Sequence, residues 1–563
     1  MYVKIKDLKF PELSAEGNDD EENKNLFLRT FYPTDSLEKI LEPNKYFLLG
    51  DKGVGKTAYA KYIKNKNESH HVSITTLEET DYERFVRLRD YFKHTESTVL
   101  DSYKDVWRLL LMLLIAEEVV HHEKRNKRIF GRGLTKLEEV LKTFYTDKTL
   151  PVLLDHLKII EKHNALAEAF GEANLGVIRM GAQHGNDASV QKEYSRYTLS
   201  NSSHYISKEI IECFENTNLT KPYIFFIDGI DVRPSTIKYN EYVECIRGLV
   251  HAAMQLNKTY LKVNKGVRKV KIVLLMRPDI YDEVSLHNPG LRLINNTVIL
   301  DWAISIYDHY ERAPLFKLAD QILAGQQKRE IREQLKPGDA WNYYFPYAIE
   351  KHPSKRKYEG DTDGSFVGFL RHSLHRPRDI IATLTFLVEL HPPISKNESH
   401  LSDSVFEYVN FSSQRFIQRY AAYLRQELNE NLAFYQDRTH FDMFLEFFNH
   451  LRDFVKSNQF SYNDYCKAFD SFDEYRREVE RSSSPKNHEH IYGNRDKFLQ
   501  FLFELNIIGF ILESSTHGHF QKWYFKRNLV SDTHQKVRRN CNYKLHNSVA
   551  YAVGLYEADY SVT

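Results

Sequence analysis

The sequence predicts an α/β protein whose core is a parallel sheet with helices on both faces, followed by mainly helical regions. Between residues 46 and 302, short apolar runs that are typical of buried parallel strands alternate with helical segments. The 563 residues include 23 glycines and 16 prolines. These are about 4% and 3% of the chain, below the usual shares of about 7% and 5%. Few glycines and prolines favour long helices over many short strands.

The composition excludes several classes of protein. Hydrophobic residues make up 42% and charged residues 28% of the chain, which excludes a wholly disordered protein. With 78 Lys and Arg against 77 Asp and Glu, the net charge of +1 argues against a protein that wraps a polyanion, although a local basic patch stays open. The 36 tyrosines and 35 phenylalanines predict large aromatic cores, with stacking on nucleic-acid bases as the alternative.

The compartment follows from the cysteines and the apolar runs. The four cysteines, at positions 213, 245, 466 and 541, form no ligand spacing and predict buried thiols in a reducing compartment. The N-terminus lacks the apolar stretch of a signal peptide, and the longest apolar run, residues 109–116, is far shorter than a membrane span. We therefore expect a cytoplasmic protein that contacts no membrane.

Taken in order, the elements divide the chain into four parts. Residues 1–30 are a polar lead-in, residues 31–302 the α/β core, residues 303–395 a helical lid, and residues 396–563 a helical C-terminal region. Within the core, strands are expected near residues 46–50, 70–77, 221–228, 269–276 and 296–302. Residues 81–200 form a large helical insertion, interrupted by a predicted hairpin at 171–185, and helices are expected near 202–215 and 239–257.

A glycine-rich loop follows the first expected strand. Its residues are Gly50, Asp51, Lys52, Gly53, Val54, Gly55, Lys56 and Thr57, which match GxxxxGK[ST]. Glycines let the backbone N–H groups turn inward onto phosphate oxygens, and the helix that follows aims its positive end at the same anion. Lys56 is expected to reach the β- and γ-phosphates, and Thr57 to offer its hydroxyl to Mg²⁺. The alternative is a simple turn between a strand and a helix.

Two acidic residues follow a later buried strand. Asp228 ends the apolar run 224–227, at the sheet edge where ligands bind in open α/β sheets, and is expected to hold Mg²⁺ through water. Asp231 follows three residues later and is expected to orient the attacking water, or else to cap the next turn.

Arginines occur at two further places. Arg277 follows the strand at 270–276 and is expected to stabilise charge on the phosphates, or else to form a surface salt bridge, with Asp279 beside it as a further candidate base. Arg376 and Arg378 start an amphipathic helix, where positive charge opposes the helix dipole. They are expected to meet the nucleotide, with solvated loop arginines as the alternative.

These motifs together resemble the additional-strand P-loop ATPases, and within them the STAND and AAA+ branches. The order GDKGVGKT, IDGID, LLMRPD and RPRD carries the resemblance. The loop, the LDW at 300–302 and RPRDI also resemble a bacterial P-loop ATPase family of prophages and defence islands. The resemblance implies ATP and Mg²⁺ as cofactors, catalytic roles for Lys56, Asp228, Asp231 and Arg277, and a possible antiviral role. No guanine-specificity motif is present, which favours ATP over GTP.

The C-terminal region resembles a winged helix. Helices are expected at 441–451, at 461–469 (a short one) and at 494–506, followed by a hairpin over 509–527. Basic residues at 495, 497, 522, 526 and 527 make DNA a possible partner, while nearby acidic residues favour contact with protein. The histidine pairs at 70–71 and 121–122 and the HEH at 488–490 are expected to be solvated rather than metal ligands.

The function expected from the whole sequence is an ATP-dependent molecular switch, assembled as a homo-oligomer or with a partner protein. The alternatives are a DNA-associated motor that grips through the winged helix, and a nucleotide-dependent scaffold with little hydrolysis. Arg292 is the candidate for an arginine that meets the phosphate of a neighbouring subunit.

Overall fold

The structure is a computed structural model of the chain. It describes residues 2–17, 20–79, 81–83, 86, 99–126, 132–144, 210–214, 219–261, 263–264, 267–284, 295–304, 307–350, 362–391, 404–435, 441–455, 457–482, 489–514, 518–526 and 535–555. The chain forms two compact units, and neither is continuous in sequence. The sheet unit comprises Leu37–Leu49 and Tyr59–Val298, and the helical unit comprises Met1–Ser36, Gly50–Ala58 and Ile299–Thr563.

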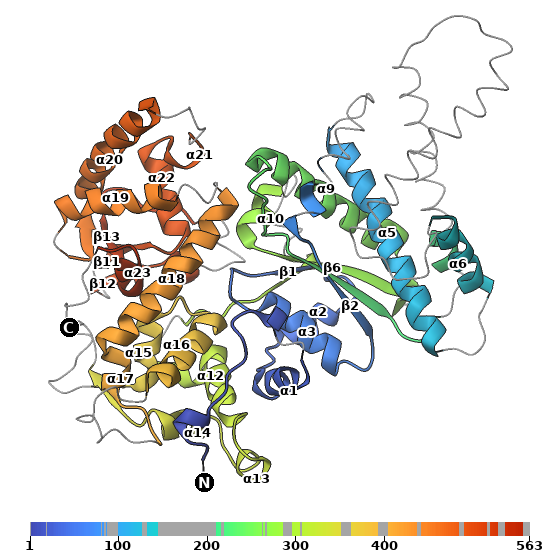
Figure 1. Ribbon diagram of the computed structural model, residues 1–563, viewed down its shortest axis with the longest axis horizontal. Helices are drawn as coiled ribbons and strands as arrows, with labels where there is room; N and C mark the ends of the chain where they lie inside the picture. Colours follow the sequence, from blue (N-terminus) through green and yellow to red (C-terminus); the bar gives the residue numbers. More distant parts are fainter. Residues whose placement is uncertain are drawn as a thin grey trace, which may run out of the picture. The chain divides into compact units, whose positions relative to one another are not determined.

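The sheet unit is built around a five-stranded, all-parallel sheet (Figure 1). The strands are β1 (Phe47–Leu49), β2 (His71–Thr76), β3 (Tyr223–Asp228), β6 (Val270–Met276) and β7 (Thr297–Ile299), in the order β2-β3-β6-β1-β7. Every residue of β3 and β6 is buried, which explains why both strands are mainly apolar. The exceptions are Asp228 at the end of β3 and Lys271 in β6, whose Nζ donates hydrogen bonds to the carbonyls of Ile40 and Glu42. The α/β core and the positions of its five strands are confirmed.

Helices flank this sheet, with α9 and α10 drawn above it and α2 and α3 below it (Figure 1). Their bounds are α2 (Ser36–Leu41), α3 (Lys56–Lys66), α5 (Val99–Asn126), α6 (Arg132–Phe144), α9 (Tyr239–Gln255), which continues into a π-turn at Leu256–Tyr260, and α10 (Pro278–Val284); the short strands β4 (Val263–Asn264) and β5 (Val267–Arg268) pair as a hairpin. Trp107 of α5 donates a hydrogen bond to the carbonyl of Cys245 in α9, at 3.0 Å, and the two helices pack along their length. The hairpin predicted at 171–185 and most of the helix predicted at 202–215 lie outside the described residues.

The helical unit begins with the N-terminal segment, which is packed rather than loose where it is described. The elements of the helical unit up to α18 are η1 (Ile5–Asp7), η2 (Ala15–Gly17), α1 (Glu21–Thr30), η4 (Tyr307–Arg312), α12 (Pro314–Ala324), α13 (Arg329–Arg332), α14 (Asp339–Tyr344), β8 (Ala348–Glu350), β9 (Thr362–Gly364), α15 (Ser365–His372), α16 (Pro377–Leu390), α17 (Tyr408–Ser412) and α18 (Gln414–Tyr435). Ile5 is fully buried, and α1 packs against α12. Trp341 stacks on Phe345 and meets Phe366 and Phe369 edge-on, so the abundant aromatic residues do form cores.

The C-terminal part of the helical unit holds three helices and a hairpin in the predicted order. It comprises α19 (Phe441–Phe454), β10 (Gln459–Ser461), α20 (Tyr462–Ser482), α21 (Glu489–Tyr492), α22 (Arg495–Glu504), β11 (Ile508–Ser514), β12 (Gly518–Lys522), η8 (Tyr524–Lys526), β13 (Asn542–Leu545) and α23 (Asn547–Ala552). The expectation of a short second helix was wrong, and the predicted hairpin is present but is part of a larger sheet. The second helix is long, because its apolar face continues to Phe472, which packs against Phe447. The hairpin belongs to a four-stranded antiparallel sheet, β10-β13-β11-β12, in which β13 pairs with β11.

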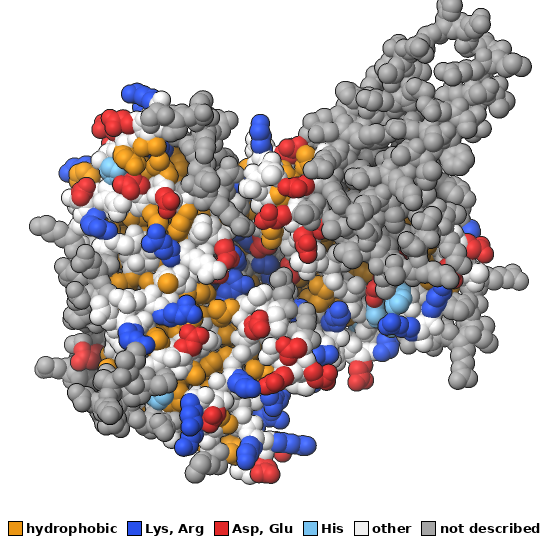
Figure 2. Space-filling model, in the orientation of Figure 1, with side chains coloured by type: hydrophobic (Ala, Val, Ile, Leu, Met, Phe, Trp, Pro, Cys, Tyr) orange, Lys and Arg blue, Asp and Glu red, His pale blue; other side chains and the backbone are white. Residues whose placement is uncertain are grey.

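The surface and the thiols bear on where the protein acts. On the face drawn in Figure 2, basic and acidic side chains are interspersed among the described residues, as the near-zero net charge leads one to expect. No described helix is both long and apolar enough to cross a membrane. All four cysteines are free thiols; Cys213 and Cys245 are buried as predicted, whereas Cys466 and Cys541 are half-buried.

Candidate functional site

The glycine-rich loop links β1 to α3 and has the backbone that its glycines allow. Gly53 has φ of 82° and Gly55 φ of 95°, in the left-handed region that residues with a side chain rarely adopt. A Cβ on Gly53 would also lie 3.2 Å from the Cβ of Arg378. The loop therefore needs glycine at both positions, and at Gly53 for space as well as for conformation.

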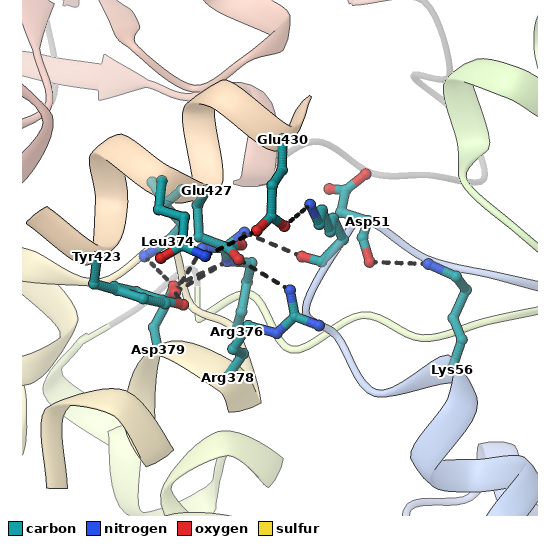
Figure 3. A network of polar contacts seen from close by, with 11 residues as sticks. Asp51, Lys56, Leu374, Arg376, Arg378, Asp379, Tyr423, Glu427 and Glu430 are labelled. Carbon is teal, nitrogen blue, oxygen red and sulfur yellow. Dashed lines mark hydrogen bonds and ion pairs between the residues drawn. The ribbon is translucent and has the colours of Figure 1, made fainter. Parts of the chain in front are cut away.

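The side chain of Lys56 is folded back onto this loop. Its Nζ donates hydrogen bonds to the carbonyl oxygens of Gly50, at 2.9 Å, and Asp51, at 3.3 Å, and the residue is only 8% exposed (Figure 3). A nearly buried ammonium group beside a curled backbone attracts an anion, because burial strengthens its field.

Trp302 supports the loop through a hydrogen bond, a role that sequence reasoning missed. Its Nε1 donates a hydrogen bond to the carbonyl of Val54 at 2.9 Å, and the ring is buried. The signal for this residue was present in the LDW motif, but spacing alone gives it no partner. Thr57, the expected Mg²⁺ ligand, is half-buried at the start of α3.

The two arginines at the start of α16 contact the loop backbone, although they lie more than 300 residues away in sequence; their expected contact with the nucleotide stays a prediction. The backbone N–H of Arg378 donates to the carbonyl of Gly53 at 3.2 Å, and Arg376 Nη1 donates to the carbonyl of Lys52 at 3.1 Å. The structure thus brings the loop and both arginines together within the helical unit.

Carboxylates neutralise these cations. Arg376 forms an ion pair with Asp379, with Nη2 and Oδ1 2.6 Å apart, and both arginines contact Glu427 (Figure 3). Lys52 Nζ lies 2.5 Å from Glu430 Oε2. Sequence reasoning did not identify Glu427 or Glu430, because nothing in the sequence of α18 distinguishes them from other helix-surface glutamates.

Asp379 is the buried centre of this network. It is fully buried and also accepts hydrogen bonds from the backbone N–H of Leu374, at 2.9 Å, and from the hydroxyl of Tyr423, at 3.0 Å. Burial and the nearby carboxylate of Asp379 raise the pKa of Tyr423, so its hydroxyl stays a donor. Burial opposes the charge of Arg376, but the carboxylates of Asp379 and Glu427 outweigh it and raise the pKa of the guanidinium. Arg376 is therefore a permanent cation fixed against the loop.

The acidic pair of the sheet unit lies at the carboxyl end of β3. Asp228 is 6% exposed, and its Oδ1 accepts a hydrogen bond from the backbone N–H of Gly229 at 2.9 Å. Asp231 is half-buried in the turn that follows. Since β1, β6 and β3 are neighbouring parallel strands, Asp228 ends its strand at the same sheet edge at which β1 ends.

Arg277, directly after β6, pairs with Asp279, two residues further along the chain. Its Nε lies 3.0 Å from Asp279 Oδ1 and its Nη2 2.6 Å from Oδ2, a two-bond arrangement with the arginine 8% exposed. This is the salt bridge that was the alternative interpretation of Arg277, although it is buried rather than on the surface. It also occupies Asp279, the further candidate base. Arg292 lies outside the described residues.

The remaining candidates are the histidine pairs and the basic residues of the C-terminal part. The expectation of solvated histidines was wrong for His71 and His122, which are half-buried with ring centroids 3.7 Å apart and ring planes tilted by 36°. His71 Nε2 also lies 2.7 Å from Glu118 Oε1. Nevertheless, no group of three or more potential ligands suited to a metal ion occurs among the residues that the structure describes. In the C-terminal part, Arg495 pairs with Asp470 and Arg539 with Asp496, and residue 527 is outside the described part of the chain.

Comparison of the chain with known protein families, with curated proteins and with solved structures found no match.

Proposed function

We propose that the chain binds a nucleoside triphosphate, with ATP as the expected nucleotide, together with Mg²⁺ at the loop Gly50–Thr57, and hydrolyses its terminal phosphoanhydride bond. The observation that carries the proposal is the loop itself. Two left-handed glycines curl the backbone, α3 starts at its end, and a nearly buried Lys56 ammonium faces the carbonyls of Gly50 and Asp51. A backbone curled by glycines, a helix N-terminus and a buried cation together favour bound phosphate.

The proposed roles follow the chemistry of each side chain. Lys56 contacts the β- and γ-phosphates, and Thr57 provides a hydroxyl for Mg²⁺. The Asp228 carboxylate holds the same ion through water, Asp231 orients the attacking water, and Arg277 would have to exchange Asp279 for phosphate before it could stabilise the transferring group. The resemblance to additional-strand P-loop ATPases implies these roles, and the position of β6 between β1 and β3 supports that resemblance.

The proposed output is a change in the helical unit, which holds both the loop and α16. Arg376 and Arg378 connect the loop backbone to α16, so a ligand on the loop acts on that helix directly. A DNA-associated motor has less support, because Arg495 and Arg539 of the winged-helix-like part already have acidic partners.

Calorimetric titration with ATP and Mg²⁺ tests the proposal on wild-type protein, Lys56→Ala and Lys64→Ala. Lys64 is an exposed residue of the same helix and serves as the matched control. We expect Lys56→Ala to bind ATP roughly 100-fold more weakly, since a buried charge-assisted contact with phosphate is worth about 3 kcal/mol. ATP turnover should disappear as well. Wild-type affinity and turnover in a folded Lys56→Ala protein would refute the proposed site.

A further inference from the structure

Two glutamates of α18 hold cations that face the glycine-rich loop. Glu427 is 7% exposed and divides its carboxylate between two arginines: Oε2 lies 3.2 Å from Arg376 Nη1, and Oε1 lies 3.0 Å from Arg378 Nη1. Glu430, almost one helical turn further along, lies 2.5 Å from Lys52 Nζ with a side chain that is 45% exposed. The close-up in Figure 3 shows both glutamates reaching from α18 toward the loop.

The three cations are not held equally. Arg376 has Asp379 as a second, fully buried counter-ion and would keep it if Glu427 moved away. Arg378 and Lys52, in contrast, are paired with carboxylates of α18. Both residues are tied to the loop through the backbone: Lys52 is part of the loop, and the N–H of Arg378 donates a hydrogen bond to the carbonyl of Gly53. Their side chains can change partner without disturbing the buried pair beneath them.

A triphosphate would compete for the same donors. Guanidinium and ammonium groups bind carboxylate and phosphate oxygens through the same charge-assisted hydrogen bonds, and phosphate offers more charge. Two carboxylates beside the loop would also repel a polyanion until they withdrew. The glutamates therefore oppose a ligand in two ways. They occupy the arginine and lysine side chains that the phosphates would bind, and they repel the negative charge of the phosphates.

We propose that Glu427 and Glu430 form a carboxylate latch, which holds α18 against the loop in the absence of nucleotide and is displaced by the phosphates of a bound nucleoside triphosphate. The inference rests on the proposed function of the loop. Displacement releases α18, which packs against both α16 and α23. The latch thus connects phosphate binding to the C-terminal part of the helical unit through a single helix.

Removing the latch charges should strengthen nucleotide binding. We expect Glu430→Gln to bind ATP about 5-fold more tightly than wild type, and Glu427→Gln about 10-fold, in calorimetric titrations at low salt. The matched control is Glu389→Gln, which removes another ion pair between α16 and α18, with Arg419 at 3.5 Å, and should leave ATP affinity unchanged. Equal or weaker ATP binding by the latch variants would overturn the proposal, since it would show that the glutamates do not oppose the ligand.

Hydrogen exchange tests the movement itself. In wild type, ATP should increase amide exchange in α18, and in the double variant Glu427→Gln/Glu430→Gln amide exchange in α18 should be raised without ATP. Unchanged exchange in both cases would overturn the latch.

If Glu427→Gln does not fold, Glu430→Gln decides, because Glu430 is at the surface. If wild type binds no ATP while folded, the proposed function fails and the latch with it. If wild type binds ATP in a Lys56-dependent manner but the glutamate variants match it, the latch alone fails.

Discussion

Asp228 and Asp231 lie three residues apart, yet their surroundings suit them to different tasks. Asp228 is nearly buried, and its carboxylate is oriented by the N–H of Gly229, so the position of the carboxylate is fixed. Asp231 lies half-buried in the turn beyond the strand. A fixed carboxylate suits a metal ion that is present in ground and transition states alike, whereas a more open one suits water that reacts.

We therefore predict that Asp228→Asn weakens Mg²⁺-dependent ATP binding as well as hydrolysis. Asp231→Asn should keep ATP binding and lose roughly 100-fold in single-turnover rate, if Asp231 is the general base. Affinity and single-turnover hydrolysis, measured on both variants, separate the two roles. Near-normal turnover in Asp231→Asn would leave Asp231 as a turn residue whose loss costs about 1 kcal/mol of stability.

At the scale of elements, the end of β3 depends on one glycine. Gly229 has φ of 77°, and a Cβ there would lie 2.2 Å from the backbone oxygen of Leu77. Leu77 follows β2, and its N–H donates to the carbonyl of Asp228 at 3.0 Å. The glycine thus lets the chain turn away directly after Asp228 while β2 and β3 stay paired.

We predict that Gly229→Ala destabilises the protein by about 3 kcal/mol or more, because the new methyl group must push the backbone of Leu77 away. Gly338→Ala is the control: its φ of 95° is also left-handed, but its Cβ would lie 3.6 Å from Phe316, an ordinary contact. That variant should lose only about 1 kcal/mol. Urea denaturation measures both, and equal losses would show that backbone conformation alone matters at Gly229.

At the scale of the whole molecule, stability depends on histidines that are buried without charge in the helical unit. His375 is 2% exposed, and its Nδ1 accepts a hydrogen bond from the N–H of Ile304 at 3.1 Å, so that nitrogen carries no proton. Burial lowers the pKa of His375 well below its usual value, and burial together with nearby His372 lowers that of His546 to about 3. In the unfolded chain these histidines have pKa values near 6.5, so below that pH they bind protons that the buried histidines of the folded chain do not bind.

We predict that the melting temperature falls as the pH drops from 6.5 toward 3, since each such histidine contributes up to ~1.4 kcal/mol of lost stability per pH unit in that window. The stability that the neutral, buried histidines contribute is fully present above pH 6.5. His546→Gln should flatten this slope, and replacing the exposed His309 by Gln should not. Parallel slopes for wild type and His546→Gln would contradict the assignment.

Several features could be predicted from the sequence because their causes are local. Strands buried on both faces are mainly apolar, so β3 and β6 were recognisable as apolar runs rich in Val, Ile, Leu and Phe, with Lys271 and the terminal Asp228 as the exceptions. A loop with left-handed residues requires glycine, so the positions of Gly53 and Gly55 marked the candidate site. The hairpin of β11 and β12 was likewise visible from its alternation and its turn.

Other features depend on contacts between distant parts of the chain. The sequence did not reveal β13 as a partner of β11, the full length of α20, or the glutamates that face the loop. By itself, the sequence determined the glycine-rich loop, the acidic strand end and the α/β class, because backbone conformation and burial restrict residue type at each position. Only the tertiary structure decided which charges meet the loop. An ion pair constrains two residues jointly through space, and a charged side chain on a helix surface carries no mark of its partner.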